Sequence, residues 1–86
     1  MPVVVKKVKK GLYYLIESST GKKVAESRSA RNARISAAIR NKHWLEAHLV
    51  TFRGQRGIWV TLKSGKRVFI PLDKVKQYFR KRGWVL

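Results

Sequence analysis

Apolar and polar residues alternate in several short stretches of this chain, which is the pattern of β-strands with one buried face. In the first third, such stretches run over residues 3–10, 12–18 and 22–27, and Gly11 and the Ser-Thr-Gly sequence at 19–21 separate them. Glycine and small polar residues favour turns. This part of the chain therefore predicts three strands joined by short turns.

The spacing of apolar residues changes after Ser29. Alanine and isoleucine then recur every three or four residues, from Ala30 to Ile39, and serine is a common residue at the N-cap of a helix. We expect a helix over residues 30–41. Its polar positions are mostly basic: Arg31, Arg34 and Arg40, with Asn41 near the stripe of the first two.

The second half repeats this order with different residues. Residues 46–54 are strand-like, the Gly-Gln-Arg-Gly sequence at 54–57 predicts a turn, and residues 58–63 and 66–72 flank Ser64-Gly65. A three-residue loop with a left-handed Gly65 pairs Ile58 with Ile70 and Val60 with Val68. One face of this hairpin is then the core face, with Ile58, Val60, Leu62, Val68, Ile70 and Leu72. The other face carries Trp59, Thr61, Lys63, Arg67 and Phe69.

A second helix is predicted after Pro71. Asp73 is a good N-cap, the helix runs to about residue 82, and Gly83 ends it, with Val75, Tyr78 and Phe79 facing inward. Trp44 and Trp84 each follow a predicted helix, and we expect them to pack it onto its sheet.

The predicted fold class is α+β. The pattern predicts two strand-strand-strand-helix units, over residues 1–44 and 45–86. We expect them to form a single domain with one shared core, antiparallel sheet structure and two helices. A chance likeness between the two halves is the alternative.

The excess of basic over acidic residues limits the classes of function that the chain can have. Lysine and arginine number 21 against four acidic residues, which gives a formal net charge of +17. The four carboxylates are scattered, and His43 and His48 have only Glu46 nearby, so we expect no catalytic site, no metal site, no cofactor and no small-molecule substrate. The chain has no cysteine, and no apolar run approaches the ~20 residues of a membrane span. Its first residues place charge after the apolar stretch, which is the wrong order for a secretory signal.

Clustered basic charge indicates a polyanion partner, and we expect nucleic acid, with RNA favoured over DNA. The Phe52–Gly57 turn, in which flexible glycines lift Arg53 and Arg56, is either a phosphate-binding turn or simply a soluble hairpin turn. The lysines of residues 6–10 either protect an edge strand, touch phosphate, or do both. The candidate contacts are Lys6, Lys7, Lys9, Lys10, Arg28, Arg31, Arg34, Arg40, Arg53, Arg56, Trp59, Lys63, Lys66, Arg67, Phe69, Lys74, Lys76, Arg80, Lys81 and Arg82.

Aromatic residues on the polar hairpin face suggest a second kind of contact. Trp59 and Phe69, beside Lys63 and Arg67, have the composition of a platform that stacks on unpaired bases. The alternative is that a helix or the other unit covers this face. Tyr13 holds the equivalent position in the first unit, and the same two alternatives, base stacking or coverage by another element, apply to it.

The whole chain, which is short, cysteine-free, strongly basic and almost without acids, resembles a small archaeal ribosomal protein of the lineage-restricted, large-subunit type. That resemblance implies a structural protein bound to ribosomal RNA in the cytoplasm, beside neighbouring ribosomal proteins. The predicted order of strands and helices also resembles Pur-type single-strand-binding folds. Three alternatives stay open: an archaeal chromatin protein in the nucleoid, a single-strand DNA- or RNA-binding protein, and a nucleic-acid-binding regulator encoded by a virus or plasmid.

Overall fold

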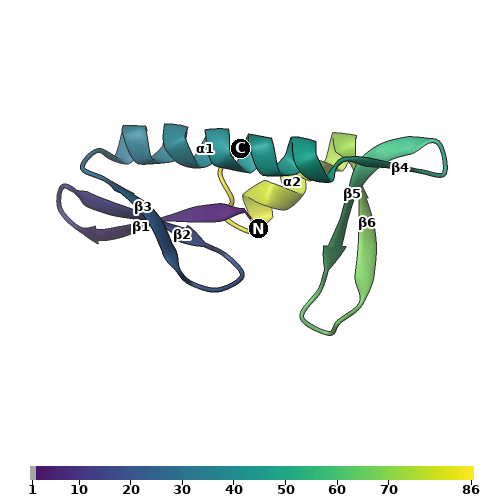
Figure 1. Ribbon diagram of the computed structural model, residues 1–86, viewed down its shortest axis with the longest axis horizontal. Helices are drawn as coiled ribbons and strands as arrows, with labels where there is room; N and C mark the ends of the chain where they lie inside the picture. Colours follow the sequence, from purple (N-terminus) through teal and green to yellow (C-terminus); the bar gives the residue numbers. More distant parts are fainter. Residues whose placement is uncertain (1) are drawn as a thin grey trace.

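A long central helix joins two antiparallel sheets of three strands each (Figure 1). The computed structural model describes residues 2–86, which form an elongated body with extents of 46 × 25 × 19 Å. In chain order the elements are β1 (Val3–Lys9), β2 (Leu12–Glu17), β3 (Lys23–Ser27), α1 (Ala30–His48), β4 (Val50–Phe52), β5 (Gln55–Thr61), β6 (Arg67–Pro71) and α2 (Leu72–Lys81). The predicted α+β class, with two antiparallel sheets and two helices, is confirmed.

The two sheets lie toward opposite ends of α1 and share no hydrogen-bonded strand pair within residues 2–86. The first sheet, in the order β1-β2-β3, packs against α1 with all three strands. In the second sheet, β4-β5-β6, strands β5 and β6 pack on α2, and β5 also contacts α1. The units therefore form neither one continuous sheet nor a face-to-face sandwich.

The hydrophobic interior is divided into two clusters along α1, where the sequence predicts one shared core. Val3, Leu15, Ala33 and Ala37 form the cluster under the first sheet. The cluster under the second sheet consists of Leu45, Ile58, Val60, Val75 and Phe79. The division follows from the length of α1, because residues 12 apart in a helix are separated by about 18 Å along its axis.

Helix α1 begins where the sequence predicts and ends later. Ser29 caps it, accepting a hydrogen bond from the Asn32 N–H at 3.3 Å. The helix continues to His48 rather than ending near residue 41, because the buried positions Ala33, Ala37, Asn41 and Leu45 continue one four-residue stripe. The expected strand over residues 46–54 is correspondingly reduced to Val50–Phe52.

The β5–β6 hairpin confirms the predicted register. Ile58 pairs with Ile70 and Val60 with Val68, while Gly65 has a φ of 87° in the connecting loop. Leu72, placed on the core face by extrapolating the alternation, is instead the first residue of α2 and is 44% exposed. The alternation fails there because the chain changes from strand to helix.

For α2, the sequence predicts the C-terminal end correctly and the N-terminal end incorrectly. Asp73 is not the N-cap: Pro71 holds that position, no side chain caps the helix, and Asp73 lies in the first turn. Gly83 does end the helix, with a φ of 75°. The Trp84 N–H then donates to the Phe79 carbonyl at 2.9 Å, and the Gly83 N–H to the Arg80 carbonyl at 3.1 Å. This pair of bonds is a Schellman motif.

Both tryptophans pack on the second cluster, but Trp44 lies within α1 rather than after it, so it does not pack the helix onto the first sheet as predicted. Trp84 meets Phe79 edge-on, with ring centroids 5.2 Å apart, and the Trp44 and Phe79 centroids are 6.1 Å apart. Val85 follows Trp84 and packs on the first cluster. The C-terminal segment therefore links the two clusters.

Candidate nucleic-acid interface

An aromatic cluster lies on the face of the second sheet that points away from α2. Alternation in the hairpin puts Trp59 and Phe69 opposite each other on this face, and β4 adds Phe52. The ring centroids are 4.9 Å apart for Phe52 and Trp59, 5.2 Å for Phe52 and Phe69, and 5.4 Å for Trp59 and Phe69. Each ring thus touches both others, and we call this surface the aromatic face.

Gly57 creates the space into which one of these rings fits. It is buried in β5, and a Cβ atom built on it would lie 2.7 Å from Cζ of Phe69 and would also collide with the Ile70 carbonyl oxygen. Real Cβ atoms do not approach neighbours this closely. The Phe69 ring therefore lies across β5 only because this position has no side chain.

Two arginines stand over the rings of the aromatic face. The guanidinium carbon of Arg67 is 5.3 Å from the centroid of Trp59, and that of Arg53 is 5.2 Å from the centroid of Phe52. Both arginines are exposed. Cation–π contacts at such exposed positions contribute about 0.5–1 kcal/mol each, so the arginines are held beside the rings but remain free to exchange partners.

The turn between β4 and β5 lies earlier than the sequence suggests. It is formed by Arg53 and Gly54, which have φ of 51° and 77°, and Phe52 pairs with Gln55 across it. Arg56 is not part of a flexible turn, since it lies within β5 and pairs with Thr51. Alternation then places Arg56 on the face opposite Trp59, so it does not join the aromatic face.

Phe52 is the member of this site that the sequence analysis missed. Had the turn been placed at Arg53-Gly54, Phe52 would have fallen on the same face as Gly57 and Trp59 by simple alternation. An arginine followed by glycine is a weaker turn signal than asparagine followed by glycine, and Gly57 offered a competing place to break the strand.

The first sheet has no equivalent of the aromatic face. Tyr13 packs on the first cluster, so it belongs to the core side of its sheet. Its neighbour Tyr14 pairs with Lys6 and has the Lys23 ammonium 4.6 Å from its ring centroid. The two units therefore share an order of elements but not a surface.

Basic side chains from both helices and the first sheet meet in a groove. A hollow of about 790 Å³ is lined by Lys7 of β1 and by Arg31 and Arg34 of α1, together with apolar residues that include Val5, Ile35 and Val85. A second hollow, of about 360 Å³, also contains Arg34 and adds Lys76 and Arg80 of α2. No acidic residue in the described chain lines either hollow. We call these five residues and the space between them the cationic groove.

Asn41 is not a surface contact, although its sequence position suggested one. Its side chain is fully buried. The stripe of Arg31 and Arg34 therefore does not extend to it, because the helix turns that position inward toward β1.

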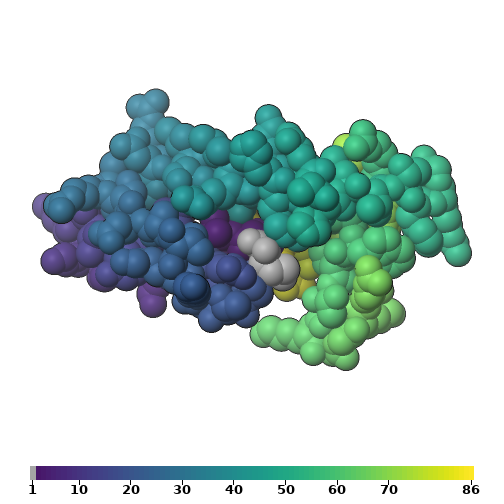
Figure 2. Space-filling model, viewed as in Figure 1, coloured from purple at the N-terminus to yellow at the C-terminus, as the bar shows by residue number. Residues whose placement is uncertain are grey.

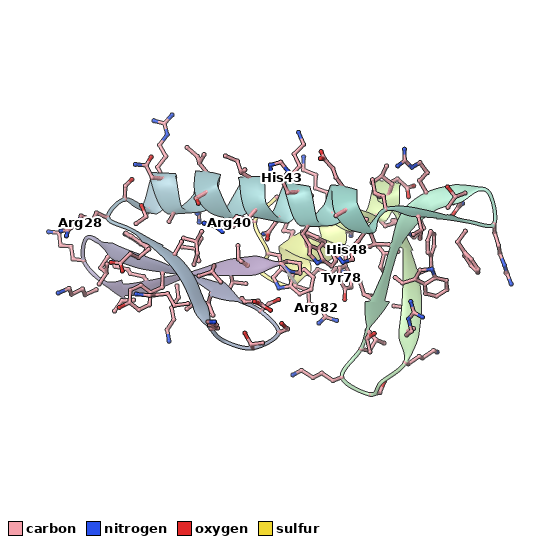
Figure 3. All side chains as sticks on the ribbon, in the orientation of Figure 1. Arg28, Arg40, His43, His48, Tyr78 and Arg82 are labelled. Atoms are coloured by element: carbon pink, nitrogen blue, oxygen red, sulfur yellow. The ribbon has the colours of Figure 1, made fainter. Side chains whose placement is uncertain are left out.

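The remaining predicted contacts are exposed but dispersed. Arg28 lies at the end of the molecule near the first sheet, and Arg82 lies below α1 beside Tyr78 (Figure 3). Lys63 and Lys66 flank the tip of the β5–β6 hairpin, which projects from the body (Figure 2). The structure does not gather the others into either surface: Lys6, Lys9, Lys10, Arg40, Lys74 and Lys81.

Almost all of the positive charge is unpaired. All 21 lysines and arginines are exposed, and within residues 2–86 one ion pair forms, between Lys23 Nζ and Glu26 Oε1 at 3.0 Å. The hydrogen bond to Glu26 raises the pKa of Lys23 above its usual value. Glu17, on the neighbouring strand β2, instead accepts a hydrogen bond from the Ser19 hydroxyl at 2.7 Å.

Within the described part of the chain, no three His, Cys, Asp or Glu side chains come together as metal ligands would. His48 stacks on Trp44, with centroids 4.4 Å apart. Neither helix in residues 2–86 combines the length and apolar character needed to cross a lipid bilayer. The chain matches no protein-family model, and comparisons with curated proteins and with solved structures gave no match.

Proposed function

We propose that this protein is a non-catalytic RNA-binding protein that holds RNA through its phosphates as a structural part of a ribonucleoprotein particle. The ribosome is the particle that its small size and charge fit best. One observation carries the proposal: 20 of the 21 basic side chains, that is 21 less Lys23, have no carboxylate partner in residues 2–86. So many like charges on a small fold repel one another unless a polyanion neutralises them.

The cationic groove is the proposed centre of phosphate binding. Arg34 of α1 lines both of its hollows, with Lys7 of β1 in the larger one and Lys76 of α2 in the smaller one. A concave set of arginines and lysines surrounds a phosphate chain, and the planar guanidinium group of Arg34 binds phosphate through paired hydrogen bonds. RNA is favoured over B-form DNA because these cations lie between elements rather than on a projecting helix that enters a major groove.

The scattered acids support a non-catalytic role. Glu46 and Asp73 lie on different helices, and Glu26 is engaged by Lys23. General acid–base chemistry needs titratable groups placed together at a substrate. The proposed partners are accordingly RNA and neighbouring proteins of the particle, without a small-molecule substrate or cofactor.

The test has two parts. Purified protein is titrated with structured RNA at low salt, where binding should be tight, and absence of any binding would overturn the proposal. Lysate from the native cell is then centrifuged through a sucrose gradient, where the protein should sediment with a ribosomal subunit and resist moderate salt. Sedimentation with DNA after RNase treatment would instead identify the chromatin alternative.

A further inference from the structure

We propose that the aromatic face is a binding site for unpaired nucleobases of single-stranded RNA. The inference rests on the proposed function and adds to it a defined site, a strand type and a mode of contact. Bases would stack on Phe52, Trp59 and Phe69, while Arg53 and Arg67 neutralise the phosphates on either side. This contact is separate from the phosphate binding proposed for the cationic groove.

The aromatic face is open to solvent. The sheet packs on α1 and α2 with its other side. Figure 1 shows no further helix or sheet of the described chain beyond the opposite side of this sheet. Phe52 is 36% exposed, and Val50, two residues before it on the same strand, is 43% exposed. Trp59 and Phe69 are half-buried, each partly covered by the other rings of the cluster. A cluster of three rings left outside the core of a small protein indicates an interaction surface.

The two arginines beside the rings indicate which kind of ligand this face binds. Both arginines already contact a ring, Arg67 over Trp59 and Arg53 over Phe52. Aromatic rings bordered by cations are the composition of single-strand sites, because every base has a face to stack and every nucleotide carries a phosphate. A second copy of this chain would bring the same arginines against them, so self-association at this face is opposed by charge.

Two features of this surface lower the stability of the folded protein. Arg53 has a positive φ of 51°, in a turn where asparagine or glycine would fit without strain. Gly57 leaves β5 without a side chain, which weakens a strand, yet it allows Phe69 to lie across it. Both are explained if an arginine at the turn and a closely packed trio of rings are needed for binding.

The experiment compares oligouridine with an RNA duplex of equal charge, binding each to the full-length protein at fixed low salt. Trp59→Ala should weaken oligouridine binding by about 5- to 150-fold, the value of one lost stacking contact. It should change duplex binding by less than about twofold. Tyr14→Ala is the matched control, because Tyr14 is also an aromatic residue with a lysine over its ring but lies on the first sheet.

A second readout does not depend on how well Trp59→Ala folds. A base stacked on an indole ring quenches its fluorescence, and Trp59 is the one tryptophan on this face, whereas Trp44 and Trp84 pack on the second cluster. Oligouridine should quench the native protein and should not quench Trp59→Phe, even though Trp59→Phe still binds it.

The outcomes separate the two proposals. If neither RNA binds, the proposed function itself fails. If both bind but Trp59→Ala weakens them equally, or quenching persists in Trp59→Phe, phosphate binding stands and the stacking site is wrong. If Trp59→Ala changes the oligomeric state in sedimentation and leaves oligouridine binding unaltered, the face serves another copy of the chain and the inference is overturned.

Discussion

The side chain of Asn41, in the middle of α1, is hydrogen-bonded to both backbone polar groups of Val3 in β1. The Val3 N–H donates to Asn41 Oδ1 at 2.7 Å, and Asn41 Nδ2 donates to the Val3 carbonyl at 3.0 Å. The same Nδ2 also donates to the carbonyl of Val85. A single buried amide therefore holds the first strand and the C-terminal segment against the central helix, between the two hydrophobic clusters.

Replacing Asn41 with alanine should destabilise the protein by about 2–4 kcal/mol, because it leaves buried N–H and carbonyl groups without partners. Chemical denaturation monitored by circular dichroism measures the change. Asn32→Ala is the control, since Asn32 is an exposed asparagine on the same helix and should change stability by less than about 0.5 kcal/mol. Equal effects of the two substitutions would contradict the role of Asn41.

Replacing Arg53 with asparagine should stabilise the protein by roughly 0.5–1 kcal/mol, since asparagine adopts a positive φ more readily than arginine. The melting temperature should rise, while affinity for oligouridine falls. Arg56→Asn removes the same charge from within β5, where asparagine is unfavourable, and should lower stability. A gain in stability from both substitutions would show that charge relief, and not backbone strain, is responsible.

Gly57→Ala should destabilise the second sheet by about 1–3 kcal/mol, because the new methyl group meets both the Phe69 ring and the backbone of β6. The near-ultraviolet circular dichroism of the aromatic face should change along with stability. Gln55→Ala alters the same strand at an exposed position and serves as the control. Unchanged spectra and stability in Gly57→Ala would mean that Phe69 does not lie across β5.

Affinity for structured RNA should fall by about 10³-fold or more between 50 and 200 mM salt if several phosphates are contacted. Arg34→Ala should weaken binding and reduce the slope of log affinity against log salt by about one unit. Arg40→Ala removes the same charge from the same helix outside the cationic groove, and its slope should change less. Identical slopes for the two variants would show that the groove has no special role.

Short-range patterns accounted for much of the fold. Alternation and the glycine loop specified the pairing of Val60 with Val68, because strand register depends on residues close in sequence. Ser29 and Gly83 marked one end of each helix for the same reason. Asp73 and Leu72 were misplaced because strand and helix patterns overlap at Pro71.

Short-range sequence patterns predicted less of the candidate site than of the fold. Trp59 and Phe69 were found because they alternate within one hairpin, whereas Phe52 depended on the position of a turn that the sequence marks weakly. The five basic residues of the cationic groove were all among the predicted contacts, but a residue type carries no information on which side chains line the same hollow. Lys7 and Arg80 line adjoining hollows although 73 positions separate them in the chain.

The amino-acid sequence by itself determined the net charge, the order of strands and helices, and the two faces of the β5–β6 hairpin, since each depends on composition or on neighbouring residues. Only the tertiary structure decided that the interior is split along α1, that Asn41 is buried as a tether, and that cations from three elements share one groove. Those features depend on how distant segments pack, and packing is settled by the shape and hydrogen bonding of the whole chain at once.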